Sequence, residues 1–269
     1  MKIINLYCEG KRGSHDFDIL EKVIEGHLNI TIKPIGGKYG ANAIMDYQEK
    51  NGNARSDFYL LFRDRDFDAP VPTAEQLHFD NKKTYYSYRT TIENYLLDVN
   101  TFFDFLQEQG NNYGLNTEEA VKALFIKVAK ELKYYQAVRH TLGALRFANS
   151  FDTTWEKGSG TLPNALDLDS CKANAWQLIE NTLNKSNQQW TKETFETTLQ
   201  EFLTLFDEVF FDELKFLVYY QGKDFAKALT KELPSFPINY YYKYAKKNFD
   251  YTKYADLVEL RAIIEQQLV

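Results

Sequence analysis

Short apolar runs that end in charged or turn-forming residues constrain the first part of the chain more than any other feature. Ile3–Cys8 is a compact apolar run that stops at Glu9, and Phe58–Phe62 is a second run that leads directly into Arg63-Asp64. Runs of this length beside turn signals are typical of buried strands. Asn29–Ile35 alternates polar and apolar residues and contains Pro34, which predicts a strand near the edge of a sheet.

Helical patterns separate these strands. Ser14 and Asp16 can cap a helix that follows the first strand, and residues 41–48 suggest a second helix after the Gly36-Gly37 turn. Thr84–Tyr88 is a weaker strand further along the chain. Alternation of strand and helix implies right-handed crossovers and a mostly parallel sheet flanked by helices, so the fold class is α/β.

The spacing of apolar residues changes after Thr91. Stripes with steps of three and four residues cover Ile92–Leu106, Val121–Tyr135, Phe195–Phe206 and Leu257–Ile264. Such stripes predict helices. We therefore expect an α/β domain over residues 1–91 and a mainly helical domain, packed on it, over residues 92–269, with a loop within residues 153–169.

Composition fits a folded protein, because 44% of the residues are hydrophobic and 16% are aromatic. Two cysteines, Cys8 and Cys171, give neither a disulfide framework nor a metal-ligand spacing. We find no secretory signal and no apolar run near the roughly 20 residues of a membrane helix, so we expect a cytoplasmic protein with no membrane segment. A net charge of −6 decides nothing about nucleic acid, because carboxylates that hold cations lower the charge of a nuclease.

Acidic side chains follow two of the predicted strands where each strand ends. Glu9 follows the first strand, and Asp64 and Asp66 follow the strand over Phe58–Phe62. Because ligands of open parallel sheets sit at the carboxyl ends of the strands, these carboxylates can converge on one cation. Residues i and i+2 of extended backbone point the same way, which would let the two aspartates share a metal face. The alternative is an ordinary turn at each strand end.

Several of these segments together resemble a toprim domain, which is shared by topoisomerases, DnaG-type primases and small ribosomal-RNA maturases. The matching segments are Leu6–Gly10, Gly36–Lys38 and Leu60–Asp68. Thr91–Leu97 and Gln221–Asp224 resemble a narrower group, the stand-alone toprim nucleases that work with an ABC-type ATPase in bacterial antiphage systems (AriB-like nucleases of PARIS systems). These are related to the overcoming-lysogenization-defect nucleases.

The resemblance implies a role for each acidic residue. Glu9 would act as metal ligand or general base, and Asp64 and Asp66 would hold Mg²⁺ or Mn²⁺. Asp68 would be a further ligand, or else the cap of a turn. Glu93 would also face the metal, although a carboxylate at a helix start is favoured by the helix dipole in any case.

Basic residues complete the expected site. Lys223 would neutralise charge on the transition-state phosphate, unless it is an ordinary surface lysine. Arg63 and Arg65 either bind nucleic-acid phosphates or balance the local charge. The aromatic and basic segment Tyr240–Lys247 either stacks on bases or packs between helices. Cys8 we interpret as a small buried residue.

The expected function is a Mg²⁺-dependent nuclease that acts on RNA or DNA. The resemblance favours structured RNA such as tRNA, and a phage-defence effector that a separate ATPase chain holds inactive; self-association into a homodimer stays open. The alternative is a non-catalytic binding or regulatory module on a toprim scaffold. A primase-like or strand-passing enzyme would need domains that we do not find.

Overall fold

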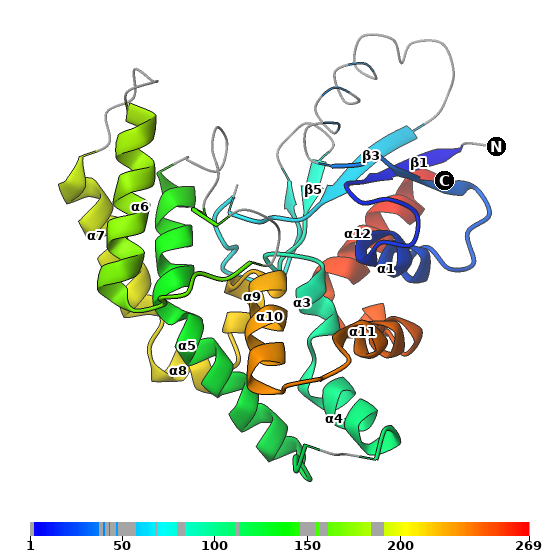
Figure 1. The fold of residues 1–269 in the computed structure, drawn as a ribbon. Helices are drawn as coiled ribbons and strands as arrows, with labels where there is room; N and C mark the ends of the chain where they lie inside the picture. Colours follow the sequence, from blue (N-terminus) through cyan, green and yellow to red (C-terminus); the bar gives the residue numbers. More distant parts are fainter. Residues whose placement is uncertain are drawn as a thin grey trace. The chain divides into compact units, whose positions relative to one another are not determined.

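The structure is a computed structural model. It describes residues 3–37, 40, 43, 47, 58–67, 69–79, 84–110, 113–145, 154–156, 161–183 and 191–268. The chain divides into two compact units (Figure 1). We call them the sheet unit, made of Met1–Arg65, Pro72–Leu96 and Lys243–Val269, and the helical unit, made of Asp66–Val71 and Leu97–Tyr242.

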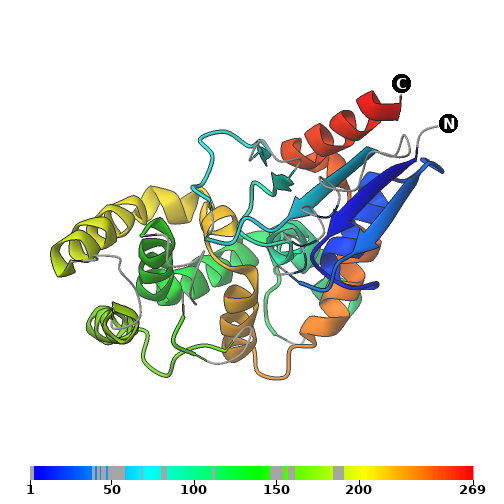
Figure 2. The ribbon, with the colours of Figure 1, turned by 90° about the horizontal axis from the view of Figure 1, so that it is seen from above.

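A five-stranded sheet forms the centre of the sheet unit. Its strands are β1 (Ile4–Cys8), β2 (Ile30–Pro34), β3 (Phe58–Arg63), β4 (His78–Phe79) and β5 (Thr84–Tyr86), in the order β2-β1-β3-β5-β4. All neighbouring pairs are parallel except β4 with β5. The mostly parallel α/β sheet is thus confirmed, with the proline-containing strand at one edge. Figure 2 shows these strands from above.

Helices from both ends of the sequence belong to the sheet unit. They are α1 (His15–Val23), α3 (Glu93–Leu96) and α12 (Ala255–Leu268), with the short 3-10 helix η2 (Tyr251–Lys253) before α12. The apolar stripe of α1 is buried, and α12 packs against both α1 and β1. The C-terminal segment therefore returns to the sheet formed by the N-terminal segment.

The helical unit is built around one long helix. Its helices are α4 (Val99–Glu108), α5 (Glu118–Ala144), α6 (Leu168–Leu183), α7 (Lys192–Leu205), α8 (Glu208–Asp212), α9 (Phe216–Tyr219) and α10 (Gly222–Glu232); α11 (Ile238–Lys247) runs from this unit into the sheet unit. α5 contacts α4, α6, α7, α8 and α10. Thr117 caps its start by accepting a hydrogen bond from the amide of Ala120 (3.1 Å). The mainly helical region after Thr91 is confirmed.

The predicted stripe Ile92–Leu106 forms two helices, α3 and α4. The break lies at Leu97-Asp98, where Asp98 takes an extended conformation (φ −113°, ψ 135°). Its carboxylate accepts a hydrogen bond from the amide of Thr101 at 2.8 Å and so caps α4. An aspartate that can cap a new helix ends the old one, although the apolar spacing continues across it.

Two predicted elements lie partly outside the described residues. Of the helix predicted over residues 41–48, only residues 43 and 47 are described, and both are helical. In the predicted loop over residues 153–169, the described positions before α6 carry no regular structure. No helix in the described part of the chain has the length and apolar character needed to cross a membrane.

Candidate functional site

Glu9 and Asp64 follow two adjacent parallel strands. Glu9 comes directly after β1 and Asp64 directly after β3, and the register pairs Cys8 with Phe62 across these strands. In the order β2-β1-β3-β5, the chain leaves β1 to form β2 on one side and later places β3 on the other. The boundary between β1 and β3 is therefore the topological switch point, where open α/β sheets bind ligands at the carboxyl ends of their strands.

Arg63, the last residue of β3, forms an ion pair with Glu9 across this switch point. Its Nε donates to Glu9 Oε1, and the side chains are 6% and 20% exposed, respectively. The Arg63 guanidinium carbon also lies 5.4 Å from the centre of the Tyr86 ring. We considered that Arg63 either binds nucleic-acid phosphates or balances local charge. In the structure it balances the charge of the Glu9 carboxylate.

The loop after Glu9 closes tightly onto the start of α1. The amide of Gly10 donates to Asp16 Oδ2 at 2.6 Å, and the Ser14 hydroxyl also donates to the Asp16 carboxylate. A Cβ at position 10 would meet the side-chain ends of Ser14 and Asp16, which would have to move to admit a larger residue. Cys8 is fully buried, and burial raises the pKa of its thiol, as expected for a packing residue.

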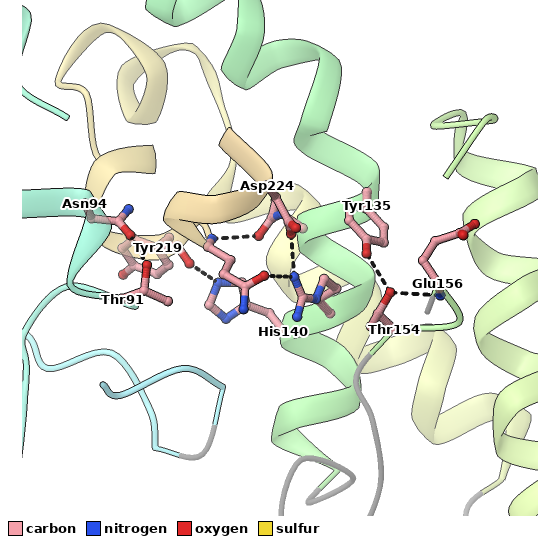
Figure 3. A network of polar contacts seen from close by, with 11 residues as sticks. Thr91, Asn94, Tyr135, His140, Thr154, Glu156, Tyr219 and Asp224 are labelled. Atoms are coloured by element: carbon pink, nitrogen blue, oxygen red, sulfur yellow. Dashed lines mark hydrogen bonds and ion pairs between the residues drawn. The ribbon is translucent and has the colours of Figure 1, made fainter. Parts of the chain in front are cut away.

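Asp64 is held by a loop that follows β5. Its Oδ1 accepts a hydrogen bond from the amide of Ile92 at 2.9 Å. We call residues 87–92 the site loop. Glu93, 5% exposed, begins α3 directly after it, and the Thr91 hydroxyl donates to Asn94 Oδ1 at 2.7 Å (Figure 3). The site loop thus connects two of the predicted metal ligands.

Arg65 fastens the site loop to the end of β3. Its side chain is fully buried; Nε donates to the Tyr88 carbonyl at 3.2 Å and Nη2 donates to the Thr90 hydroxyl at 2.9 Å. The Arg65 amide donates to the Ser87 hydroxyl at 3.2 Å. A buried guanidinium with these partners cannot bind a nucleic-acid phosphate, so that interpretation of Arg65 is wrong.

Asp66 lies at the beginning of a turn, not in extended backbone. Its φ is +47°, a left-handed conformation that aspartate tolerates better than most residues. The i and i+2 argument for a face shared with Asp64 therefore does not apply here. Asp68 lies outside the described residues.

No family model matches the chain, and no curated protein matches it either.

The segment Asp66–Val71 belongs to the helical unit and is held there by Phe67. The Arg139 guanidinium carbon lies 4.6 Å from the centre of the Phe67 ring, and the His140 ring meets Phe67 edge to face at 4.9 Å. A Cβ at Gly143 would lie 2.6 Å from the Phe67 carbonyl oxygen. One face of α5 therefore fits closely around the residue that follows Asp66.

The same face of α5 holds the start of α10 through a buried polar network. Asp224 accepts from Arg139 Nη1 and, at 2.7 Å, from Gln136 Nε2 (Figure 3). Arg139 Nη1 also donates to Gln221 Oε1 at 2.6 Å, and the Gln221 amide donates to Gln136 Oε1 at 3.1 Å. Gln136, Arg139 and Asp224 are all at most 5% exposed. This network fixes the first turn of α10.

Lys223 lies in that first turn and is exposed, beside the buried Asp224. The helix begins at Gly222. Within the helical unit, Arg139 contacts both Phe67, next to Asp66, and Asp224, next to Lys223. Two segments that the toprim resemblance singles out thus share one residue of α5.

The aromatic and basic segment forms α11. Tyr241 is fully buried and packs against Phe102 and Phe105 with ring centroids 5.0 Å and 5.6 Å away, whereas Tyr240 is 68% exposed. Lys246 forms an ion pair with Asp18 of α1. Packing therefore accounts for the position of Tyr241, and Tyr240 is the ring that faces solvent.

The carboxylates at the carboxyl ends of β1 and β3 fit a hard cation that is held by few protein ligands. Among the described residues, no group of three or more His, Cys, Asp or Glu side chains is arranged to hold a metal. Mg²⁺ is usually bound by one or two carboxylates together with waters and substrate phosphates. Glu9 and Asp64 provide such a pair at adjacent strand ends.

Sequence reasoning did not predict that four charged residues would be buried. Arg65, Arg139, Asp224 and Asp256 are charged but at most 5% exposed. A charged residue in a polar stretch is ordinarily assigned to the surface, because burying a charge costs free energy unless it is paired. The pattern around Asp224 offered one signal, since the Gln221–Asp224 motif included it.

Proposed function

We propose that this protein is a Mg²⁺- or Mn²⁺-dependent nuclease of the toprim type, which hydrolyses phosphodiester bonds in nucleic acid. The observation that carries the proposal is the placement of Glu9 and Asp64 directly after the two strands that flank the switch point of the sheet. Ligand sites of open α/β sheets form there, and two carboxylates give such a site its chemistry.

In this proposal Glu9 and Asp64 hold the cation, with Asp66, Asp68 and Glu93 as further candidate ligands. When bound, the metal supplies an activated water and neutralises charge on the scissile phosphate. Lys223 provides a positive charge at the start of α10.

Arg63 has two partners in this scheme. A cation held by Glu9 would replace the Arg63 guanidinium as the charge partner of that carboxylate, and Arg63 would then be available to pair with a substrate phosphate.

The substrate and partners follow from the resemblance alone. We propose RNA, structured RNA such as tRNA in particular, with DNA as the alternative substrate. We also propose that the chain is a phage-defence effector controlled by an ABC-type ATPase, with a homodimer as a further candidate assembly. These are analogies of fold and motif.

The second candidate function is a non-catalytic binding or regulatory module on the same scaffold. One observation favours it: the Glu9 carboxylate is already neutralised by Arg63. A module that has lost its metal could keep this arrangement unchanged.

A cleavage assay separates the two functions. The purified chain is incubated with total RNA and with plasmid DNA in Mg²⁺, Mn²⁺ or EDTA, with and without a cognate ATPase. Glu9→Gln and Asp64→Asn keep side-chain shape and remove the charge that a cation needs. Glu208→Gln on α8 is the matched control, because that carboxylate is 75% exposed.

We expect cleavage that requires the metal, falls by orders of magnitude in both site variants, and persists in the control. The rates are compared per folded protein, measured by circular dichroism. Cleavage at the parental rate by folded Glu9→Gln protein would end the nuclease proposal, as would no cleavage of either substrate under any condition.

A further inference from the structure

Asp256, in the first turn of α12, is a buried carboxylate far from Asp64 in sequence. It is fully buried, and desolvation raises its pKa above the ordinary value, although hydrogen bonds from Tyr95 and Tyr88 act in the opposite direction. Its Oδ2 accepts from the Tyr88 amide at 2.9 Å and from the Tyr95 hydroxyl. Its Oδ1 has no hydrogen-bond partner among the described residues.

The hydrogen bonds to Asp256 come from both ends of the site loop. Tyr88 lies near the start of the loop, and Tyr95 lies in α3, just beyond its end. Tyr254, beside Asp256 in the sequence, donates its hydroxyl to the Tyr95 carbonyl at 2.9 Å. The C-terminal segment therefore holds the loop at two points.

The cation of Arg89 strengthens this attachment. Its guanidinium carbon lies 5.3 Å from the Tyr95 ring centre and 5.0 Å from that of Tyr254. Its Nη1 donates to the Asn94 carbonyl at 2.7 Å. The Arg89 guanidinium thus lies over the rings of Tyr95 and Tyr254, whose hydroxyls donate to Asp256 and to the Tyr95 carbonyl, respectively. These cation–π contacts stabilise this arrangement of the loop.

The site loop also contacts Arg65 and Asp64, which follow β3 at the proposed metal site. The amide of Tyr88 donates to Asp256, while its carbonyl accepts from Arg65 Nε, so one peptide segment connects the C-terminal helix to the end of β3. Further along the same loop, the Ile92 amide donates to Asp64. Burying a carboxylate costs free energy, and a neutral apolar residue would pack in α12 without that cost.

We infer that Asp256 is a positioning residue of the proposed nuclease site, which acts through the site loop to hold the Asp64 carboxylate in place. The inference rests on the proposed function for its catalytic consequence, but the structural link can be measured without any cleavage. The segment Lys243–Val269 thereby completes a site whose carboxylates lie in the N-terminal part of the chain.

The test compares hydrogen–deuterium exchange of a peptide covering residues 87–96 in the full-length chain and three variants. Asp256→Ala removes both acceptors. Asp256→Asn keeps one oxygen, which can accept both bonds now made by Oδ2. Leu260→Ala, fully buried in the same helix, is the control for general destabilisation.

We expect exchange in this peptide, relative to a β1 peptide, to rise at least tenfold in Asp256→Ala and to stay near the parental value in Asp256→Asn and Leu260→Ala. Where Asp256→Ala does not fold, Tyr95→Phe removes one of the two bonds and is expected to give a smaller rise of the same kind. Equal exchange in Asp256→Ala and Leu260→Ala would overturn the inference.

Cleavage assays on the same proteins distinguish this inference from the proposed function. We expect kcat to fall at least tenfold in Asp256→Ala, with KM little changed, and to recover in Asp256→Asn. A parent that cuts neither RNA nor DNA refutes the nuclease, and the catalytic role of Asp256 with it, whereas the exchange result still decides the loop attachment. An opened loop with parental kcat refutes the positioning role alone.

Discussion

The buried Arg139–Asp224 pair gives the sharpest prediction about the helical unit. Asp224→Leu leaves a guanidinium that is 5% exposed without its carboxylate, and Arg139→Met leaves a carboxylate that is 2% exposed with Gln136 as its remaining side-chain donor in the described network. Removing one member of a buried pair costs about 3–5 kcal/mol. For a unit of this size, that lowers the melting temperature by about 6–20 °C.

The double variant Arg139→Met/Asp224→Leu should behave differently from the sum of its parts. Replacing both charges by apolar residues of similar volume is often nearly neutral, because no unpaired charge remains. The methionine also keeps a contact with the Phe67 ring that Arg139 now covers at 4.6 Å. We expect the double variant to lie within about 2 kcal/mol of the parent, against about 6–10 kcal/mol if the single effects added.

Urea unfolding of the four proteins, followed by circular dichroism, measures this coupling. The pair Lys130–Glu208 on α5 and α8 is the control cycle, since its side chains are 43% and 75% exposed and exposed pairs contribute at most about 1 kcal/mol. Additive single effects at Arg139 and Asp224 would refute the mutual pairing. If the pair positions Lys223, the folded double variant also cleaves more slowly than the parent.

Two further predictions concern a close contact and a titration. Gly143→Ala places a Cβ 2.6 Å from the Phe67 carbonyl oxygen, so we expect destabilisation of about 1–3 kcal/mol despite the better helix propensity of alanine; a thermal melt at or above the parental one contradicts this. The raised pKa of Asp256 means that the folded state binds its proton more tightly than the unfolded state, so this group's contribution is complete below its ordinary pKa and is lost as pH rises through the folded pKa. Asp256→Asn does not titrate and should gain stability relative to the parent as the pH rises above the ordinary aspartate pKa of about 4, which urea melts at several pH values check; a difference that does not change with pH contradicts it.

The strand ends were predictable because local patterns determine them. β1 ends at Cys8, directly before Glu9, and the apolar run Phe58–Phe62 of β3 ends at Arg63, the last residue of that strand. Pro34 marks an edge strand because it lacks an amide donor. The positions of Glu9 and Asp64 follow directly from those boundaries. β4 was missed because a two-residue strand carries no alternation that a sequence pattern could reveal.

The supports of the site could not be predicted because they depend on contacts between distant segments. Arg65 is buried because Tyr88 and Thr90, more than 20 residues away, supply its acceptors. Asp256 is buried because α12 returns to the sheet unit, and the apolar stripe of that helix does not say which unit it will cover. Periodicity identifies the buried face of a helix but does not identify its neighbour.

The balance of charges at the carboxyl ends of β1 and β3 determines which measurements can detect metal binding. Carboxylates crowded together without a cation would repel one another, and removing one would then stabilise the protein. In the structure, however, Arg63 already neutralises Glu9, and the Ile92 amide hydrogen bonds to Asp64. Glu9→Gln should therefore be somewhat less stable than the parent whether or not the chain is a nuclease, because a nearly buried guanidinium loses its ionic partner. Stability of the metal-free variant cannot separate the two candidate functions. Stabilisation by added Mg²⁺ can separate them, because a ligand stabilises the state that binds it. Only a parent with a working site would gain more folding stability from Mg²⁺ than its Glu9→Gln variant.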